Sequence, residues 1–181
     1  HEVARTLNAS PSGPFYQGLK MLGKRNLPTE YLTQGSFVTH LVKRISKKPQ
    51  PDEIAVKNGV TLEDDESLPF RYYWITNRDE VIVKILENYF GAISEEFSAE
   101  WNHPSAQTYI LRKTVVFVGL LEAFDGIWPE SKKEKTASKE FFSKIARRFR
   151  QNLGDRSLTA GEFGSSAAAA GALRKALLGQ A

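Results

Sequence analysis

Two sets of side chains share the i, i+3, i+4, i+7 spacing that places residues along one face of an α-helix. The first set is His40, Lys43, Arg44 and Lys47, and the second is Lys144, Arg147, Arg148 and Gln151. A stripe of cations of this kind can neutralise the phosphates of a nucleic-acid backbone, with an affinity that falls steeply as salt rises. An ordinary solvated helix face has the same pattern, so both interpretations stay open.

A second candidate site lies where an apolar segment begins. Arg112, Lys113 and Thr114 come directly before that segment, and the start of a helix offers free amides to an anion. The same side chains also fit interactions with local backbone and nearby carboxylates. The turn Gly164-Ser165-Ser166 has two interpretations as well, a phosphate contact or the N-cap of the last helix.

The sequence assigns no catalytic residue and no metal ligand, and it identifies no cofactor. It contains no His-Glu-x-x-His zinc helix, no Gly-Lys-Ser/Thr phosphate loop and no Gly-x-Ser-x-Gly elbow. Cysteine is absent, which removes thiolate nucleophiles, disulfides and cysteine zinc sites. Trp101 and His103 have rings that stack on bases, but Trp101 also completes an apolar helix face, and His103 beside Pro104 fits a surface turn.

Length and composition indicate one globular domain over residues 1–181. Hydrophobic residues make up 41% and charged residues 25% of the 181 positions, which is ordinary for such a domain. The longest apolar run, residues 115–121, is far shorter than the roughly 20 residues that cross a bilayer. With no cysteine and no signal-peptide pattern, we expect a soluble, cytoplasmic protein without a membrane partner.

The net charge of +4 conceals an uneven distribution along the chain. Residues 1–51 form a basic N-terminal part, with eight Lys/Arg against two Asp/Glu. The central helical part, residues 52–127, is acidic, with four against twelve in residues 52–100, and the linker and helices of residues 128–181 are basic again, with nine against four up to residue 156. This distribution fits a basic face for phosphates, or helix faces that neutralise one another after folding.

Apolar periodicity predicts a mainly α fold. The first expected helix starts near Ser36 and ends before Pro49. The other expected helices span about 79–101, 109–124, 138–152 and 165–178. Asn77 is expected to cap the helix at 79–101, with Glu80 completing a capping box. The alanine-rich last helix, ended by Gly179, is expected to act as a terminal brace. Between the helices we expect a short strand at 68–75, a polar loop at 59–65 and a proline-containing basic linker at 128–135.

Two stretches carry a resemblance to a known family. The first, residues 4–22, reads ARTLNASPSGPFYQGLKML, and the second, residues 101–124, reads WNHPSAQTYILRKTVVFVGLLEAF. The matched positions are Leu7, Asn8, Ser12, Pro14, Phe15, Leu19 to Leu22, Trp101, Asn102, Pro104, Lys113, Thr114, Phe117, and Phe163 to Ser166 before the alanine-rich helix. In this order they resemble the later, helical portion of DGQHR-domain proteins, which are associated with bacterial DNA modification and defence.

The resemblance has two departures. The Asp-Gly-Gln-His-Arg string that names the family is absent, and Val115 and Val116 stand where many relatives have a Thr-Gly-like pair. The chain opens on His1 rather than Met, so we expect the C-terminal part of a larger α/β protein. No active-site residue of the missing half can be assigned here.

The resemblance implies a DNA-binding regulatory or accessory component of a DNA-modification or defence system, such as phosphorothioation. DNA is then the expected partner, with the missing N-terminal portion or other proteins of the system as further partners. One alternative is part of a nucleotide-dependent nucleobase- or DNA-modifying enzyme whose catalytic half is missing. Another is a protein-interaction module that docks through the small-residue face of the last helix.

Overall fold

The computed structural model describes residues 1–21, 31–102, 113–164 and 166–180, and it confirms a mainly α fold. These residues form ten helices and one parallel pair of strands, with Leu19 opposite Leu32. In chain order the elements are α1 (Glu2–Ala9), β1 (Leu19–Lys20), β2 (Leu32–Thr33), α2 (Gln34–Val42), α3 (Pro49–Lys57), α4 (Arg71–Ile75), α5 (Asp79–Glu96), α6 (Ser98–Trp101), α7 (Thr114–Glu134), α8 (Lys139–Leu153), α9 (Ala160–Phe163) and α10 (Ala167–Leu177). None of the helices described is long and apolar enough to cross a membrane.

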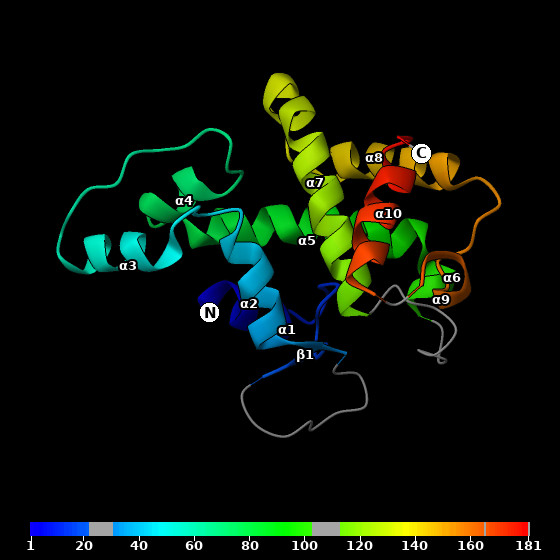
Figure 1. Cartoon of the computed structure of the whole chain (residues 1–181), viewed down its shortest axis with the longest axis horizontal. Coiled ribbons are helices and arrows are strands. Elements are labelled where there is room, and N and C mark those ends of the chain that lie inside the picture. The colour runs from blue at the N-terminus through cyan, green and yellow to red at the C-terminus, as the bar shows by residue number, and fades with distance from the viewer. Residues whose placement is uncertain (22–30, 103–112, 165, 181) are drawn as a thin grey trace.

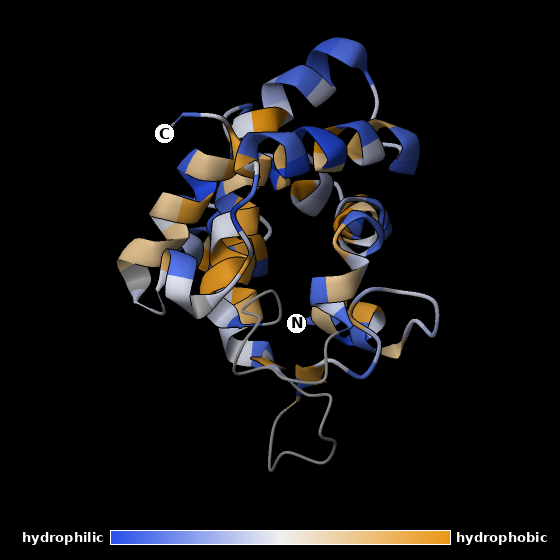
Figure 2. Cartoon of the chain, turned by 90° about the vertical axis from the view of Figure 1, so that its right-hand side faces the viewer, coloured by the Kyte–Doolittle hydropathy of each residue, from blue (hydrophilic) through white to orange (hydrophobic). Residues whose placement is uncertain are grey.

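The long helices α5 and α7 cross near the middle of the molecule, and the other helices pack around them (Figure 1). α8 lies along α5, α10 lies along α7 and also contacts α8, and α1 packs against α5 and α2. Hydrophobic and hydrophilic residues alternate along the helical ribbons in Figure 2, as expected where each helix buries one side. Buried side chains of α1, α2, α5, α7, α8 and α10 form one continuous core.

Four phenylalanine rings join segments that are far apart in the sequence. Phe15 lies edge-on to Phe37 and Phe90, with ring centroids 5.5 Å and 4.8 Å apart. Phe117 stacks on Phe37 at 5.2 Å and on Phe90 at 5.6 Å. All four rings are buried, so the turn after α1 is fixed to α2, α5 and α7 by aromatic packing.

Asn8 holds the turn that carries Phe15. Its side-chain Oδ1 accepts a hydrogen bond from the Leu19 amide at 2.8 Å, and its carbonyl accepts one from the Gln17 amide at 3.0 Å. These bonds close the loop of residues 10–18 against the end of α1. α1 therefore ends at Ala9, directly after Asn8, and the Ser-Pro-Ser-Gly-Pro turn of residues 10–14 has a fixed position beside α5.

The alanine-rich α10 packs closely on α7, as a terminal brace should. A Cβ added at Gly119 of α7 would lie 3.0 Å from the Ala170 carbonyl oxygen, and one at Gly126 would lie 2.8 Å from Leu178 Cδ1. Glycine on one helix and alanine on the other therefore set the short distance between them. The residues of α10 buried by this contact are Ala169, Ala170, Leu173, Ala176 and Leu177.

Five further predicted features are confirmed with small changes at their ends. The helix predicted at 79–101 consists of α5 and the short α6, and α8 begins after Ser138, whose Oγ accepts the Phe141 amide at 3.2 Å. α2 begins two residues earlier than expected, with Thr33 as its cap. Gly179, at φ +66°, follows the end of α10. Residues 60–65 form a loop without helix or strand.

The strand predicted at 68–75 is wrong, because Arg71 to Ile75 form the short helix α4. The Trp74 amide donates to the Phe70 carbonyl at 3.1 Å, and the described strands β1 and β2 pair only with each other. The buried Arg71 guanidinium donates to the carbonyls of Glu63 and Ile45 and to the Asp52 carboxylate. Aromatic composition suggested a strand, but these contacts favour a helical turn.

Two other local predictions are also wrong. Asn77 does not cap α5: it adopts a left-handed conformation at φ 54°, and Arg78 occupies the cap position without a side-chain cap bond. The linker predicted at 128–135 is instead the end of α7, which continues through Pro129. Proline removes one helical hydrogen bond, but the buried Ile127 and Ser131 on either side anchor this turn in the core. Lys135, at φ 51°, ends the helix.

Candidate nucleic-acid interface

The predicted stripe of α2 does not form, because α2 ends at Val42 and Lys43 is its C-cap. Arg44 is the main correction: only 5% of its side chain is exposed. Its Nε and Nη2 donate to the two carboxylate oxygens of Asp125 in α7, at 3.0 Å and 2.6 Å, and its Nη1 donates to the His40 carbonyl. Arg44 therefore stabilises the contact between α2 and α7 and is not available to a phosphate.

The other members of this first set are also dispersed. Lys47 lies beyond the helix and pairs with Asp65 at 2.7 Å. The pKa of His40 is lowered by burial and by the positive charges of Lys43 and Arg44, against a smaller opposing effect of Glu122, so His40 is neutral at pH 7. Lys43 alone stays exposed without an ion pair among the residues described.

The second stripe, on α8, is confirmed as an exposed helix face. α8 is continuous from Lys139 to Leu153 and buries Phe141, Phe142, Ile145 and Phe149 on its opposite side. Lys144 and Arg147 are exposed and have no carboxylate partner in the described part of the chain. The Arg147 Nε donates to the Ser143 carbonyl at 3.3 Å, one turn earlier. Arg148, 44% exposed, makes two hydrogen bonds to Glu130 of α7 and is partly neutralised.

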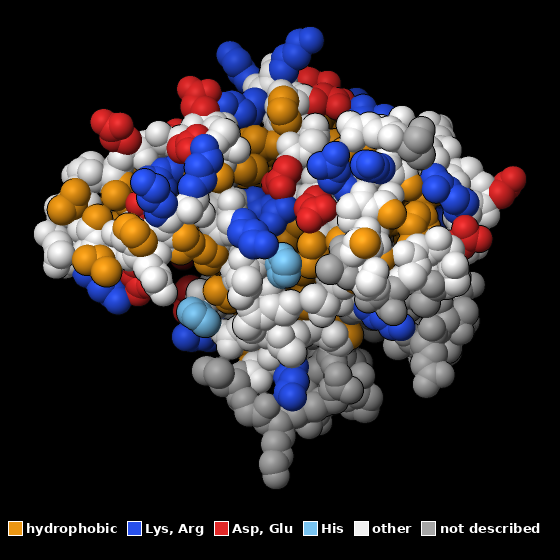
Figure 3. All heavy atoms as spheres, in the orientation of Figure 1, with side chains coloured by type: hydrophobic (Ala, Val, Ile, Leu, Met, Phe, Trp, Pro, Cys, Tyr) orange, Lys and Arg blue, Asp and Glu red, His pale blue; other side chains and the backbone are white. Residues whose placement is uncertain are grey.

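Opposite charges from the basic and acidic parts of the sequence meet across the surface. Four such ion pairs are Lys47–Asp65, Lys132–Glu66, Lys139–Glu95 and Arg150–Glu100, at 2.5 to 2.8 Å. Lysine, arginine and acidic side chains are interspersed over the face seen in Figure 3, without a large field of one sign. The interpretation in which the charged segments neutralise one another after folding is therefore correct for much of the described surface.

The predicted anion site at the start of α7 lies partly outside the described residues, because Arg112 and its preceding segment are not among them. Lys113 is half-buried at the N-cap position of α7 and makes no side-chain cap bond, and Thr114 is exposed. At the start of α10, Ser166 has the cap position but also makes no side-chain cap bond, and Ser165 lies outside the described residues.

Trp101 is buried, with 6% of its surface exposed, and completes the apolar side of α5 and α6. This position confirms the structural interpretation of Trp101 rather than base stacking. His103 lies outside the described residues. In the part of the chain that the structure describes, no three His, Asp or Glu side chains gather in a way that could hold a metal ion.

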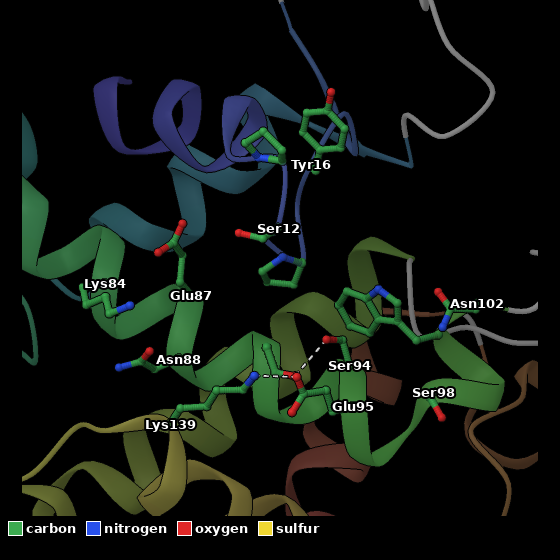
Figure 4. Close-up of a pocket in the computed structure, with 15 residues that line it drawn as sticks. Ser12, Tyr16, Lys84, Glu87, Asn88, Ser94, Glu95, Ser98, Asn102 and Lys139 are labelled. Atoms are coloured by element: carbon green, nitrogen blue, oxygen red, sulfur yellow. Dashed lines mark hydrogen bonds and ion pairs between the residues drawn. The ribbon is translucent and has the colours of Figure 1, made fainter.

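Sequence reasoning missed a polar pocket of about 550 Å³ between the Ser-Pro-Ser-Gly-Pro turn and α5. Side chains from the turn, α5, α6 and the first residue of α8 line it (Figure 4), among them Ser12, Lys84, Glu87, Asn88, Trp101 and Lys139. Two stretches of the family resemblance, at Ser12 to Pro14 and at Trp101-Asn102, meet at this pocket. Each stretch carries part of the family resemblance, but nothing in the sequence spacing between them indicates that they face one another.

A glycine in the middle of α5 keeps part of this pocket open. Gly91 lines the pocket, and a Cβ added there would meet no atom within 4 Å. Glycine inside a helix costs about 1 kcal/mol relative to alanine. Since packing does not require it, the open space at Gly91 is a feature that the fold itself does not explain.

The chain matches no known family model, no curated protein and no solved structure. The resemblance to DGQHR-domain proteins stays a prediction, and the site geometry has to be interpreted from its own chemistry.

Proposed function

We propose that this protein binds nucleic acid through the outer face of α8, as a DNA-binding regulatory or accessory component of a bacterial DNA-modification or defence system. The observation that carries the proposal is the exposure of Lys144 and Arg147 on one helix face without a carboxylate partner among the described residues. The family resemblance supplies the biological setting, including phosphorothioation as an example.

The size of the interface limits the strength of binding. Lys144, Arg147 and the partly neutralised Arg148 provide two or three phosphate contacts on α8. Each contact contributes a slope of roughly −0.9 to the dependence of log affinity on log salt for duplex DNA. We therefore expect weak, sequence-independent binding with a slope of roughly −2 to −3 from this face. Lys43 and Lys113 are further candidate contacts, and the structure places them on other elements.

Fluorescence anisotropy with duplex DNA at several salt concentrations tests the proposal. The double variant Lys144→Glu, Arg147→Glu should weaken binding and reduce the magnitude of the salt slope by roughly two. Neither substitution breaks an ion pair of the described structure, so the helix should stay folded.

A matched control reverses Lys48 and Lys57 on and beside α3, which Figure 1 shows on the opposite side of the molecule from α8. The net charge of this control changes by the same amount. Among the described residues, the only ion pair it removes is the exposed one from Lys57 to Glu53, one turn away. Equal weakening by both double variants would mean that overall charge, and not the α8 face, attracts DNA.

The structure bears differently on the two alternatives, a protein-interaction module and part of a nucleotide-dependent enzyme. The small-residue face of α10, the predicted docking surface of an interaction module, is already buried against α7. Participation in a nucleotide-dependent enzyme is favoured by one observation, the polar pocket beside α5.

A further inference from the structure

We infer that the pocket between the Ser-Pro-Ser-Gly-Pro turn and α5 binds a single unstacked nucleotide of a strand whose backbone lies along α8. The inference rests on the proposed function, because the same nucleic acid supplies the nucleotide and contacts the α8 cations. It goes beyond backbone binding, since it adds a site that would distinguish single-stranded from duplex nucleic acid.

The first argument is a set of hydrogen-bonding groups that the described residues leave unused. Lys84, Glu87, Ser12 and Asn102 line the pocket, and their side chains make no hydrogen bond or ion pair with described residues. Asn88 donates through Nδ2 to the Ala137 carbonyl at 2.9 Å, and its Oδ1 has no donor among them. Figure 4 shows Ser12 on the turn on the opposite side of the pocket from the α5 residues Glu87 and Asn88.

The second argument is the balance of charge in the pocket. Lys139 pairs with Glu95 at 2.5 Å, and Lys84 and Glu87 provide one further charge of each sign. The site is therefore not simply an anion site. It suits a ligand that has hydroxyl and amide donors together with a phosphate, and Tyr16, 43% exposed at the rim, offers an aromatic face for a base.

Size and helix geometry are consistent with this ligand. A volume of about 550 Å³ lies in the usual range of roughly 300 to 1,000 Å³ for small-molecule sites. Lys139 lines the pocket and is also the first residue of α8, so Arg147 lies roughly 12 Å further along the same helix at 1.5 Å per residue. A strand that contacts Arg147 and Lys144 can therefore reach the pocket with a neighbouring nucleotide.

Gly91 provides the third argument and the best probe. Glycine destabilises the interior of a helix, and no neighbouring atom excludes a Cβ at this position of α5. Because Gly91 lines the pocket and a Cβ there meets no atom within 4 Å, a side chain added at this position starts in open space. Gly91→Leu should therefore fill the pocket and leave the thermal midpoint unchanged or higher.

The experiment compares a single-stranded oligonucleotide with a duplex of equal length by anisotropy at one salt concentration. We expect wild-type protein to prefer the single strand, and Gly91→Leu to weaken single-strand binding roughly tenfold while duplex binding is unchanged, as the loss of one stacked base predicts. The matched control is Gly171→Leu in α10, where a Cβ also meets nothing within 4 Å, outside the pocket.

The outcomes separate this inference from the proposed function. Wild-type single-strand affinity in Gly91→Leu overturns the pocket, and the proposed function stands if Lys144→Glu, Arg147→Glu still weakens duplex binding. Single-strand binding that Gly91→Leu reduces but the α8 variant leaves unchanged overturns α8 as the backbone site. Calorimetry with a free mononucleotide distinguishes the source: binding that Gly91→Leu abolishes, without any preference for single strands, overturns the strand as the source.

Discussion

α2 and α8 carry the same spacing of cations, but the fold uses the two patterns in different ways. The helix α8 is continuous, and Lys144 and Arg147 share an exposed face on it. No carboxylate among the described residues pairs with either side chain. On α2 the helix ends before the pattern does, and Arg44 turns inward to Asp125. Identical spacing therefore yields one exposed stripe and one internal ion pair.

The difference shows that the length of a helix decides whether a spaced set of cations forms a surface. α8 has a Ser138 cap and buries the same side throughout its length. After α2, Ser46 donates to Asp52 at 2.6 Å and accepts the Lys48 amide at 2.9 Å, and Pro49 is the first residue of α3. The chain therefore changes direction between Lys43 and Pro49, and Lys47 meets the acidic loop at Asp65.

The largest expected effect comes from removing Arg44. Arg44→Met should lower the free energy of unfolding by about 2 kcal/mol, because Asp125 would lose two charge-assisted hydrogen bonds. The estimate lies below that for a fully buried pair, since the Asp125 side chain is 43% exposed and water can replace part of the interaction. Urea denaturation followed by circular dichroism measures the change.

The matching variant on α8 is Arg147→Met, which should change the free energy of unfolding by less than about 0.5 kcal/mol. Its side chain is exposed and makes only one hydrogen bond to its own helix. Equal losses in the two variants would contradict the distinction between an internal ion pair and an exposed stripe.

Sequence periodicity predicted the long amphipathic helices well, because each buries a continuous apolar side. α5, α8 and α10 lie close to their expected ranges. It failed where a tertiary contact overrides local preference. Arg71 binds Asp52 and two carbonyls and so favours helix in an aromatic segment, and α7 continues through Pro129 because its neighbours are buried. α3, which contains no buried residue, offered no periodic signal.

The candidate site was predicted only in part for a related reason. Spacing identified Lys144 and Arg147, which depend on one helix alone. Arg44 depends on Asp125, 81 residues later, and no local pattern connects the two. The pocket brings Ser12 and Asn102 together through the packing of Phe15, so its position is a property of the whole core.

The two helices should also differ, by a smaller amount, in how their side chains make the stability of the protein depend on pH. Burial, Lys43 and Arg44 lower the pKa of His40, so the unfolded chain takes up a proton near its usual pKa of about 6.5 before the folded chain does. His40 therefore reduces stability as pH falls from about 7.5 to 5.5. His40→Gln removes this effect, and its stability relative to wild type should rise over that range in urea denaturation. For the control Lys144→Met on α8, the difference in the free energy of unfolding from wild type should stay constant over the same pH range. A constant difference for His40→Gln as well would show that the His40 imidazole is protonated as easily in the folded chain as in the unfolded chain.

The smallest expected effect concerns the surface ion pair between Lys47 and Asp65. The Lys47 ammonium, followed by two hydrogen bonds from Ser67, lowers the pKa of Asp65 to about 2. Because the folded pKa is below the usual value of about 3.9, the associated stability is present above that value and is lost as pH falls through about 2. Lys47→Met should raise the pKa of Asp65 part of the way to its usual value in an NMR titration of the carboxyl carbon, and Arg147→Met should not. An unchanged pKa in Lys47→Met would mean that Ser67 alone stabilises the carboxylate, and Lys47 would then join Lys43 as a cation free to meet a phosphate.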